Sequence, residues 1–143
     1  MNSGKFRVAI ISAGMIANAA HIPAYRNMLD ECEVVAVCDI NEEAARQTAA
    51  RHGIPGVYAD AEEMLLREKP DLVSICTSNA AHLPMAKLAL ECGANVLCEK
   101  PLGTSYPDAL EAFETARRMD KILVACQSAR FTPEHLDARS LAV

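Results

Sequence analysis

Short apolar runs alternate along this chain with longer segments in which apolar and charged residues recur at helical spacing. The runs are rich in Val, Ile, Leu and Cys and lack strict polar–apolar alternation. That pattern predicts strands buried on both faces, which are typical of parallel sheets. Six such runs occur, at residues 6–11, 34–38, 56–58, 72–76, 95–98 and 122–126.

Helical segments separate the strands, and local signals mark their ends. Pro23 is expected to kink or divide the first helical stretch, because proline lacks an N–H and clashes with the carbonyl of Ala19. Asn41 and Asp60 stand where a helix N-cap would accept a backbone N–H, and Gly53 stands at a helix end. Further helices are predicted at about 81–92 and 105–119, with weaker helical character at 132–143.

The alternation of strands and helices predicts right-handed β-α-β units. Two βαβαβ halves of this kind make the doubly wound α/β fold, a Rossmann fold whose six parallel strands lie in the order 3-2-1-4-5-6. With 143 residues the chain is long enough for one such domain and its core.

Charge and hydropathy exclude several classes of partner. The formal net charge is -5 and the pI is near 5.3, which argues against nucleic acid, because phosphate binding needs clustered Lys and Arg. Lys5 and Arg7 before an apolar run resemble a secretory signal, but Gly14 breaks the run, which fits a strand and turn better. No run is long enough to span a bilayer. We expect a cytoplasmic protein with no membrane partner.

The cysteines form no C-x-x-C pair, and no histidine lies at zinc-finger spacing from them. Several fall near the ends of predicted strands. They are therefore expected to be small core residues in a reducing compartment, with neither a disulfide framework nor a metal site. The six are Cys32, Cys38, Cys76, Cys92, Cys98 and Cys126.

The turn after the first strand reads Ser-Ala-Gly-Met-Ile-Ala over residues 12–17. The dinucleotide-binding fingerprint is G-x-G-x-x-G/A, and Gly14 and Ala17 occupy its second and third small positions. Such a turn leads into a helix whose first N–H groups hold a pyrophosphate. Ser12 replaces the first glycine, which raises the question of strain. Without a ligand the same pattern is simply a tight turn.

Asp39 ends the second strand, about 25 residues past Gly14. An acid at this place hydrogen-bonds the adenosine ribose hydroxyls and disfavours the 2′-phosphate of NADP. No arginine in residues 39–42 would compensate. The alternative is that Asp39 only helps to cap the following helix. The conjunction of strand, turn, helix, strand and acid favours nucleotide binding, with NAD preferred.

Two polar segments follow the fourth and fifth strands. Thr77-Ser78-Asn79 lies at the topological switch point, where short polar side chains can hold the nicotinamide half of a dinucleotide. His82 is either a ribose contact or an ordinary residue of the next helix. Glu99-Lys100-Pro101 places a lysine at the sheet edge, where it can donate to a substrate oxygen and stabilise negative charge. The alternative is a surface ion pair at a strand end.

These motifs, in this order, resemble the amino-terminal domain of the Gfo/Idh/MocA oxidoreductases. The most specific piece is Cys98-Glu99-Lys100-Pro101, and Arg130-Phe131 with Pro133 follows the sixth strand. The resemblance covers residues from about 5 to 135. It implies NAD(P)-dependent oxidation or reduction of a sugar, cyclitol or related hydroxyl compound.

The resemblance also implies roles for individual residues. Lys100 would be the catalytic lysine, and Gln127, Ser128 and Arg130 would approach the nicotinamide end. The implied cofactor-binding residues are Ser12, Ala13, Gly14, Met15, Ile16, Asp39, Ile40, Thr77, Ser78, Asn79, His82, Glu99, Lys100 and Gln127.

Members of that family carry a carboxyl-terminal α/β domain with the substrate pocket, an aspartate and histidine for proton transfer, and usually the oligomer interface. We expect that domain to be absent, with 1–130 as the Rossmann domain and 131–143 as the truncated start of the connection. His135 and Asp137 do not match the proton-transfer motif. Because hydride transfer needs a positioned substrate and a proton acceptor, the isolated chain is expected to be inactive.

Two further expectations follow. The alternative function is a stand-alone NAD-binding or regulatory module without catalysis. Apolar residues near Phe131, Leu136 and Leu141 are expected to be exposed, which predicts a homo-oligomer.

Overall fold

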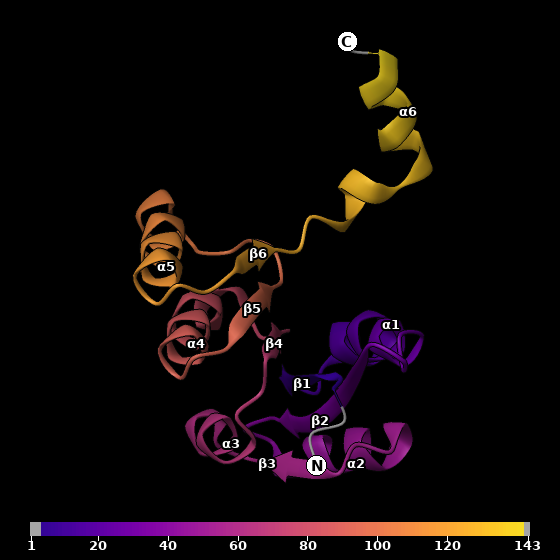
Figure 1. Ribbon diagram of the computed structural model, residues 1–143, viewed down its shortest axis with the longest axis vertical. Coiled ribbons are helices and arrows are strands. Elements are labelled where there is room, and N and C mark those ends of the chain that lie inside the picture. The colour runs from indigo at the N-terminus through magenta and orange to yellow at the C-terminus, as the bar shows by residue number, and fades with distance from the viewer. Residues whose placement is uncertain (1–3, 142–143) are drawn as a thin grey trace.

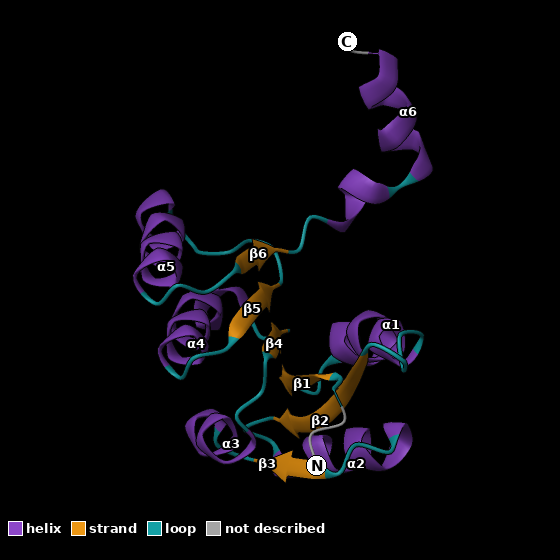
Figure 2. Cartoon of the chain, viewed as in Figure 1, coloured by secondary structure: helices purple, strands orange, loops and turns teal. Residues whose placement is uncertain are grey.

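The predicted strands form one six-stranded sheet in the computed structural model, which describes residues 4–141 (Figures 1 and 2). The strands are β1 (Phe6–Ile11), β2 (Cys32–Cys38), β3 (Gly56–Tyr58), β4 (Leu72–Ile75), β5 (Asn95–Cys98) and β6 (Leu123–Ala125). The helices are η1 (Ala17–His21), α1 (Ile22–Arg26), α2 (Glu42–His52), α3 (Ala61–Glu68), α4 (Asn79–Glu91), α5 (Tyr106–Arg118), η2 (Ser128–Phe131) and α6 (Pro133–Leu141).

All neighbouring strands are parallel, and the order is β3-β2-β1-β4-β5-β6. This confirms the predicted doubly wound topology. β2 begins two residues earlier than predicted, because the register pairs Phe6 with Cys32 and Arg7 with Glu33. The partner strand thus extends β2 beyond the run of valines.

Both faces of the sheet are buried, as the unbroken apolar runs predict. Ala9 and Ile11 of β1 belong to the core cluster that includes residues of α3, α4 and α5. Val8 and Ile10 belong to the cluster built with η1, α1 and α2. Figure 1 shows these two groups of helices on opposite sides of the strands. Apolar burial on both faces is the main source of stability in such a layered domain.

Side-chain caps fix three helix starts. Asn41 accepts the Ala44 N–H at the start of α2, and Asp60 accepts the Glu63 N–H at the start of α3. Ser105 does the same for α5. The α2 helix ends at Gly53 in the left-handed conformation, which glycine adopts without steric cost. The predicted caps at 41 and 60 are therefore confirmed.

The first helical stretch changes from π-helical to α-helical geometry at Ile22, next to Pro23, but its helical backbone is not broken there. The π-helical turn η1 ends at His21, and α1 carries Pro23 in its first turn. Single π turns inside helices change the direction in which later side chains point. Here the change coincides with His21, whose side chain is buried against the sheet.

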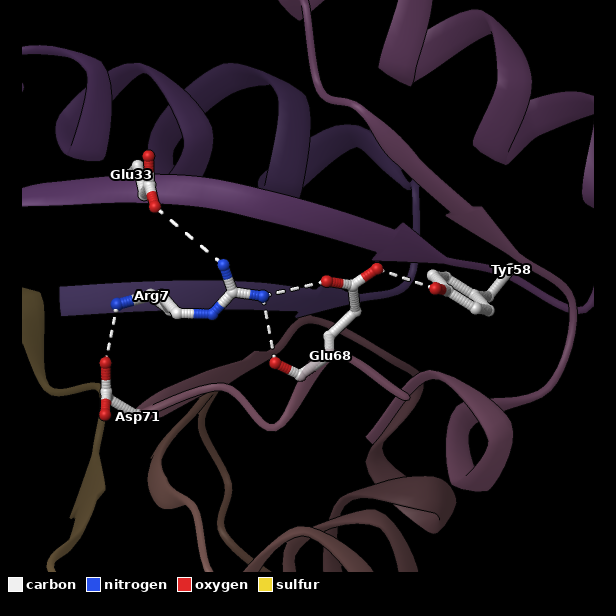
Figure 3. A network of polar contacts seen from close by, with 5 residues as sticks. All are labelled: Arg7, Glu33, Tyr58, Glu68 and Asp71. Carbon is white, nitrogen blue, oxygen red and sulfur yellow. Dashed lines mark hydrogen bonds and ion pairs between the residues drawn. The ribbon is translucent and has the colours of Figure 1, made fainter. Parts of the chain in front are cut away.

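A polar network ties the sheet to α3 on one face (Figure 3). The Arg7 guanidinium donates to Glu68 Oε2 and to the Glu68 carbonyl, both at 2.9 Å. Tyr58 donates its hydroxyl to the other oxygen of Glu68 at 2.6 Å, and the Arg7 N–H donates to Asp71 at 2.8 Å. Glu33 lies farther from the guanidinium, at 3.9 Å. One carboxylate thus joins residues from β1, β3 and α3.

The last described segment extends away from the sheet (Figure 1). η2 and α6 form there, which agrees with the weak helical character of the sequence. α6 has no buried residue. Its apolar side chains Leu136 and Leu141 are 48% and 86% exposed, as expected.

Candidate functional site

The polar segments singled out in the sequence follow neighbouring strands at one edge of the sheet. Ser12 follows β1, Asp39 follows β2, and Glu99 follows β5. The turn from Thr77 to Asn79 follows β4 and leads into α4, which starts two residues earlier than predicted, with Ser78 at its N-cap. Carboxyl ends of parallel strands share one edge, and open α/β sheets bind ligands there.

The backbone at Ser12, in the turn after β1, is in a conformation that is strained for a residue with a Cβ. Its φ is +88°, a left-handed value that favours glycine, which is the residue that the fingerprint has there. The Ser12 hydroxyl donates to Asp39 at 3.3 Å and accepts the Gly14 N–H at 3.3 Å. A serine here therefore has a less favourable backbone conformation than a glycine would have, but its side chain makes two long hydrogen bonds within the turn. Met15 and Ile16, which follow, are exposed.

Asn18 also fixes this turn, and sequence reasoning missed it. Its amide N–H groups donate to the carbonyls of Ala13 and Gly14 at 2.8 and 3.0 Å. Its side chain is held in turn by Thr48 and His52 of α2. An asparagine one residue past the fingerprint was the available signal. Its partners on α2 are about 30 residues away, so the residues around Asn18 could not predict those contacts.

Asp39 contacts the turn directly. One carboxylate oxygen accepts the Ala13 N–H at 2.7 Å, and the other accepts the Asn41 N–H at 2.9 Å. The carboxylate thus joins the turn after β1 to the start of α2. The first of these oxygens, Oδ2, also accepts the Ser12 hydroxyl, so the capacity to accept a ribose hydroxyl lies on Oδ1, which accepts the Asn41 N–H alone.

A hollow of about 560 Å³ lies beside Asp39 between the ends of β1, β2 and β4. Its volume lies within the range of small-molecule sites. Ile40, 97% exposed, is at its mouth, and Met85 and Leu88 of α4 provide apolar walls. Its polar lining includes Ser12, Asp39, Asp60, Glu62, Thr77 and Ser78. A larger hollow of about 1090 Å³ lies beside Arg7 and Glu68 and includes neither Gly14 nor Lys100.

His82 is 1% exposed. Its Nδ1 lies 2.5 Å from the Pro101 carbonyl oxygen and its Nε2 lies 3.1 Å from the Thr77 carbonyl oxygen. The imidazole therefore bridges the turns after β4 and β5. Both ring nitrogens already have protein partners, and a direct ribose contact stays a prediction.

Glu99 and Lys100 lie at the end of β5, and the Lys100–Pro101 bond is cis. The Lys100 side chain is exposed and makes no ion pair with any residue of the described range 4–141. The surface ion pair considered as an alternative is therefore not formed. Glu99 instead accepts the Lys100 backbone N–H at 3.1 Å and contacts His21 Nε2 at 3.0 Å.

The electrostatics of Glu99 favour a carboxylate. Burial by itself would raise the pKa of Glu99, but hydrogen bonds from His21, the Lys100 N–H and Cys126 outweigh it and hold that pKa below its ordinary value. Burial raises the pKa of Cys126, and the neighbouring Glu99 charge raises it further, so this thiol stays protonated. The ligand atoms of His21, Glu99 and Cys126 lie within 4.8 Å of one another. Hydrogen bonds among these groups account for that closeness.

Gln127, Ser128 and Arg130 follow β6 and are exposed. Gln127 and Arg130 line a hollow of about 490 Å³ together with Phe113, Phe131 and Leu136. Their approach to a nicotinamide stays a prediction. All six cysteines are free thiols. Cys32, Cys38, Cys76 and Cys98 are buried, as expected of core residues, whereas Cys92 and Cys126 are only partly buried.

The fold and the edge together define a dinucleotide-binding Rossmann domain of the oxidoreductase class. A family model described as "Oxidoreductase family, NAD-binding Rossmann fold" (GFO_IDH_MocA) matches residues 6–127. The chain therefore belongs to the Gfo/Idh/MocA oxidoreductase family.

Individual relatives agree with this assignment. D-glucoside 3-dehydrogenase of Escherichia coli (strain K12) is 42% identical over 123 residues, which are 86% of this chain and 35% of the relative. D-apiose dehydrogenase of Paraburkholderia graminis is 31% identical over 90% of this chain and 34% of its own length. The crystal structure of the WlbA dehydrogenase of Chromobacterium violaceum in complex with NADH and UDP-GlcNAcA matches with a TM-score of 0.88 and 29% identity, over 95% of this chain and 39% of that one.

The chain thus spans little more than a third of the length of the curated relatives it matches. Among residues 4–141, no helix combines the length and the apolar character that a membrane crossing requires.

Proposed function

We propose that this chain binds NAD(H) along the carboxyl edge of its sheet and that Lys100 assists hydride transfer at a hydroxyl-bearing carbon of a sugar or cyclitol. One observation carries the proposal. The Gly14 turn, Asp39, the Thr77–Asn79 turn and Glu99–Lys100 come from four separate segments and follow four neighbouring strands of one sheet.

The adenosine end of the cofactor fits the hollow beside Asp39. Its apolar walls suit a flat base, and Ile40 can cover that base at the mouth. Asp39 is already anchored by two backbone N–H groups, so its carboxylate is oriented before a ligand arrives. A fixed carboxylate accepts ribose hydroxyls and repels a 2′-phosphate, which supports NAD over NADP.

The nicotinamide end belongs at the turns after β4 and β5. When bound, the cofactor would supply the hydride chemistry. The residues proposed to hold it there are Thr77, Ser78, Asn79 and Glu99. Lys100, exposed and without an ion pair in the described part of the chain, would donate to the substrate oxygen and stabilise its negative charge. His82 would act by holding these two turns together.

The substrate class rests on the relatives. Their printed names include a D-glucoside 3-dehydrogenase and a D-apiose dehydrogenase. Because the chain spans about a third of those relatives, we propose that substrate recognition and proton transfer need residues beyond this chain. The chain alone would then bind cofactor without turnover. The free cysteines support a reducing compartment, which we propose to be the cytoplasm.

The test is calorimetric titration of the chain with NADH and, separately, with NADPH. NADH is expected to bind more tightly. Asp39→Asn should move the ratio of the two dissociation constants toward NADPH by about tenfold, equivalent to ~1.4 kcal/mol, because it removes the charge that repels the 2′-phosphate. Asp30→Asn is the matched control, since it removes one exposed negative charge elsewhere.

Equal affinity of the unmodified chain for both nucleotides would contradict the role of Asp39. Failure to bind either nucleotide, with the far-ultraviolet spectrum of a folded protein, would contradict cofactor binding by this chain. An unchanged ratio in Asp39→Asn would show that the carboxylate does not face the ribose.

A further inference from the structure

A chain of hydrogen bonds runs from the first helices through the sheet to the residue before Lys100. The Tyr25 hydroxyl lies 2.9 Å from Ser74 Oγ, and Ser74 Oγ lies 2.9 Å from His21 Nδ1. His21 Nε2 lies 3.0 Å from Glu99 Oε1. Ser74 is fully buried and His21 is 6% exposed. The proposed function does not use Tyr25, Ser74 or His21.

One set of proton positions satisfies every link while the imidazole is neutral. Glu99 is a carboxylate and can only accept, so His21 must carry its proton on Nε2. Its Nδ1 then accepts, and the Ser74 hydroxyl donates to it. The Ser74 oxygen in turn accepts from Tyr25. The direction of donation is therefore the same at every link, from α1 toward Glu99.

The position of Ser74 indicates that this series of hydrogen bonds has a role besides packing the core. Ser74 lies in β4 between Val73 and Ile75, both fully buried, and an apolar residue would fill such a position without any polar group to satisfy. Burying a hydroxyl and an imidazole costs free energy unless both are hydrogen-bonded. In this fold the buried polar groups lead to one carboxylate, and its second oxygen accepts the Lys100 N–H at 3.1 Å.

We propose that His21 is a positioning residue: it donates from Nε2 to Glu99 while its Nδ1 accepts from Ser74, and it thereby fixes the Glu99 carboxylate beside Lys100 for the cofactor. This inference rests on the proposed function for its consequence on cofactor binding, but the tautomer follows from the hydrogen-bond geometry and the carboxylate form of Glu99. Glu99 sets the tautomer because it can only accept, and the Ser74 hydroxyl, which can donate or accept, satisfies the other ring nitrogen.

The other titratable groups facing Glu99 carry no competing charge at neutral pH. Burial raises the pKa of Cys76 and of Cys98 to about 12 each. Cys126 also has a raised pKa, through burial and the Glu99 charge. The thiols near Glu99 are therefore neutral, and the Lys100 ammonium adds positive charge on the solvent side. Cys126, which also hydrogen-bonds Glu99, is only partly buried, so His21 is the buried side chain that can orient the carboxylate.

The first experiment reads the tautomer by long-range ¹H–¹⁵N spectra of the histidine side chains at neutral pH. The unmodified chain should show His21 protonated on Nε2. Ser74→Ala removes the donor to Nδ1 but leaves Glu99 as the acceptor at Nε2, so His21 should stay protonated on Nε2 while the ¹⁵N signal of Nδ1 shifts toward that of a nitrogen without a donor. Tyr25→Phe, which leaves the Ser74 donor in place, should keep the Nε2–H form. A His21 protonated on Nδ1 in the unmodified chain would overturn the proposal.

The second experiment measures NADH affinity in folded variants, checked by their thermal midpoints. His21→Leu should weaken NADH binding by about tenfold, a change of ~1.4 kcal/mol. His21→Gln, which keeps an N–H donor near Glu99, should recover much of that loss. His135→Leu, which removes an exposed imidazole on α6 away from the turns at the sheet edge, is the comparison for loss of an imidazole elsewhere.

The outcomes separate the two proposals. A folded His21→Leu chain with unchanged NADH affinity would overturn the positioning role, while NADH binding itself would stand. If the unmodified chain binds no NADH but shows the Nε2–H tautomer, the proposed function fails for this chain and the orientation of Glu99 by His21 is supported. Where His21→Leu does not fold, the Ser74→Ala spectra and the His21→Gln affinity decide.

Discussion

At the scale of single residues, the polar side chains at the sheet edge act on one another before any ligand is present. Asp39 and Asn18 both hydrogen-bond the backbone of the turn after β1, and His21 hydrogen-bonds Glu99. Such prior ordering lowers the entropy that binding must remove. The most unusual of these residues is Ser12, whose positive φ is a value rarely adopted by residues with a Cβ.

Replacing Ser12 separates backbone strain from side-chain bonding. Ser12→Ala keeps the Cβ in the left-handed region and loses both hydroxyl bonds, so it should lower the free energy of unfolding by about 1 kcal/mol. Ser12→Gly loses the same bonds but relieves the strain, and it should be more stable than Ser12→Ala by ~1–2 kcal/mol. Urea unfolding followed by circular dichroism measures both. An alanine variant as stable as the glycine variant would contradict strain at this turn.

At the scale of elements, α3 is joined to the sheet by polar contacts as well as by Met64 and Leu65 of the core. Glu68, the last residue of α3, accepts from Arg7 on one oxygen and from Tyr58 on the other. Its side chain is 22% exposed, whereas Glu33, the other acid that pairs with the Arg7 guanidinium, is 43% exposed. Exposed ion pairs contribute little, and charged hydrogen bonds shielded from solvent contribute more.

The two glutamates therefore make a matched pair for mutation. Glu68→Ala should lower the free energy of unfolding by about 1–3 kcal/mol, because Arg7 and Tyr58 both lose an acceptor. Glu33→Ala should cost less than ~0.5 kcal/mol, given its 3.9 Å separation and exposure. Urea midpoints of the two variants make the comparison. Similar losses in both would show that the network adds nothing beyond surface charge.

At the scale of the whole molecule, the sheet ends in an edge strand that keeps apolar side chains exposed. β6 is three residues long, with Val124 48% exposed, and Ile122 just before it is 66% exposed. Phe131 and Leu136 line a hollow with Val124 beside this edge. Unpaired strand edges with apolar side chains favour association.

We therefore predict that the chain self-associates through the β6 edge. Sedimentation velocity at increasing protein concentration should show a growing share of dimer or larger species. Val124→Lys should reduce that share, because a charge on an edge strand opposes pairing. Leu66→Lys, which changes a similarly exposed apolar residue on α3, is the control and should leave association unchanged. A chain that stays monomeric at high concentration would contradict this prediction.

The sequence by itself determined the fold and the edge at which the site lies. Unbroken apolar runs indicate strands buried on both faces, and helices between them favour parallel pairing, so the doubly wound fold with its usual strand order could be predicted. Asn41, Asp60 and Gly53 were predictable because a cap depends on its nearest neighbours. The motifs around Gly14, Asp39 and Lys100 were visible for the same reason, although their roles in binding stay predictions.

Only the tertiary structure decided which side chains meet. His21 and Glu99 are 78 residues apart, and Arg7 and Glu68 are 61 apart. Helical or strand periodicity carries no information about such pairs, because the angle and register at which each helix packs on the sheet set them. The burial of His82 between two carbonyls has the same origin. The sequence therefore predicted which segments form the candidate site, and the packing of helices against the sheet decided which side chains of those segments contact one another.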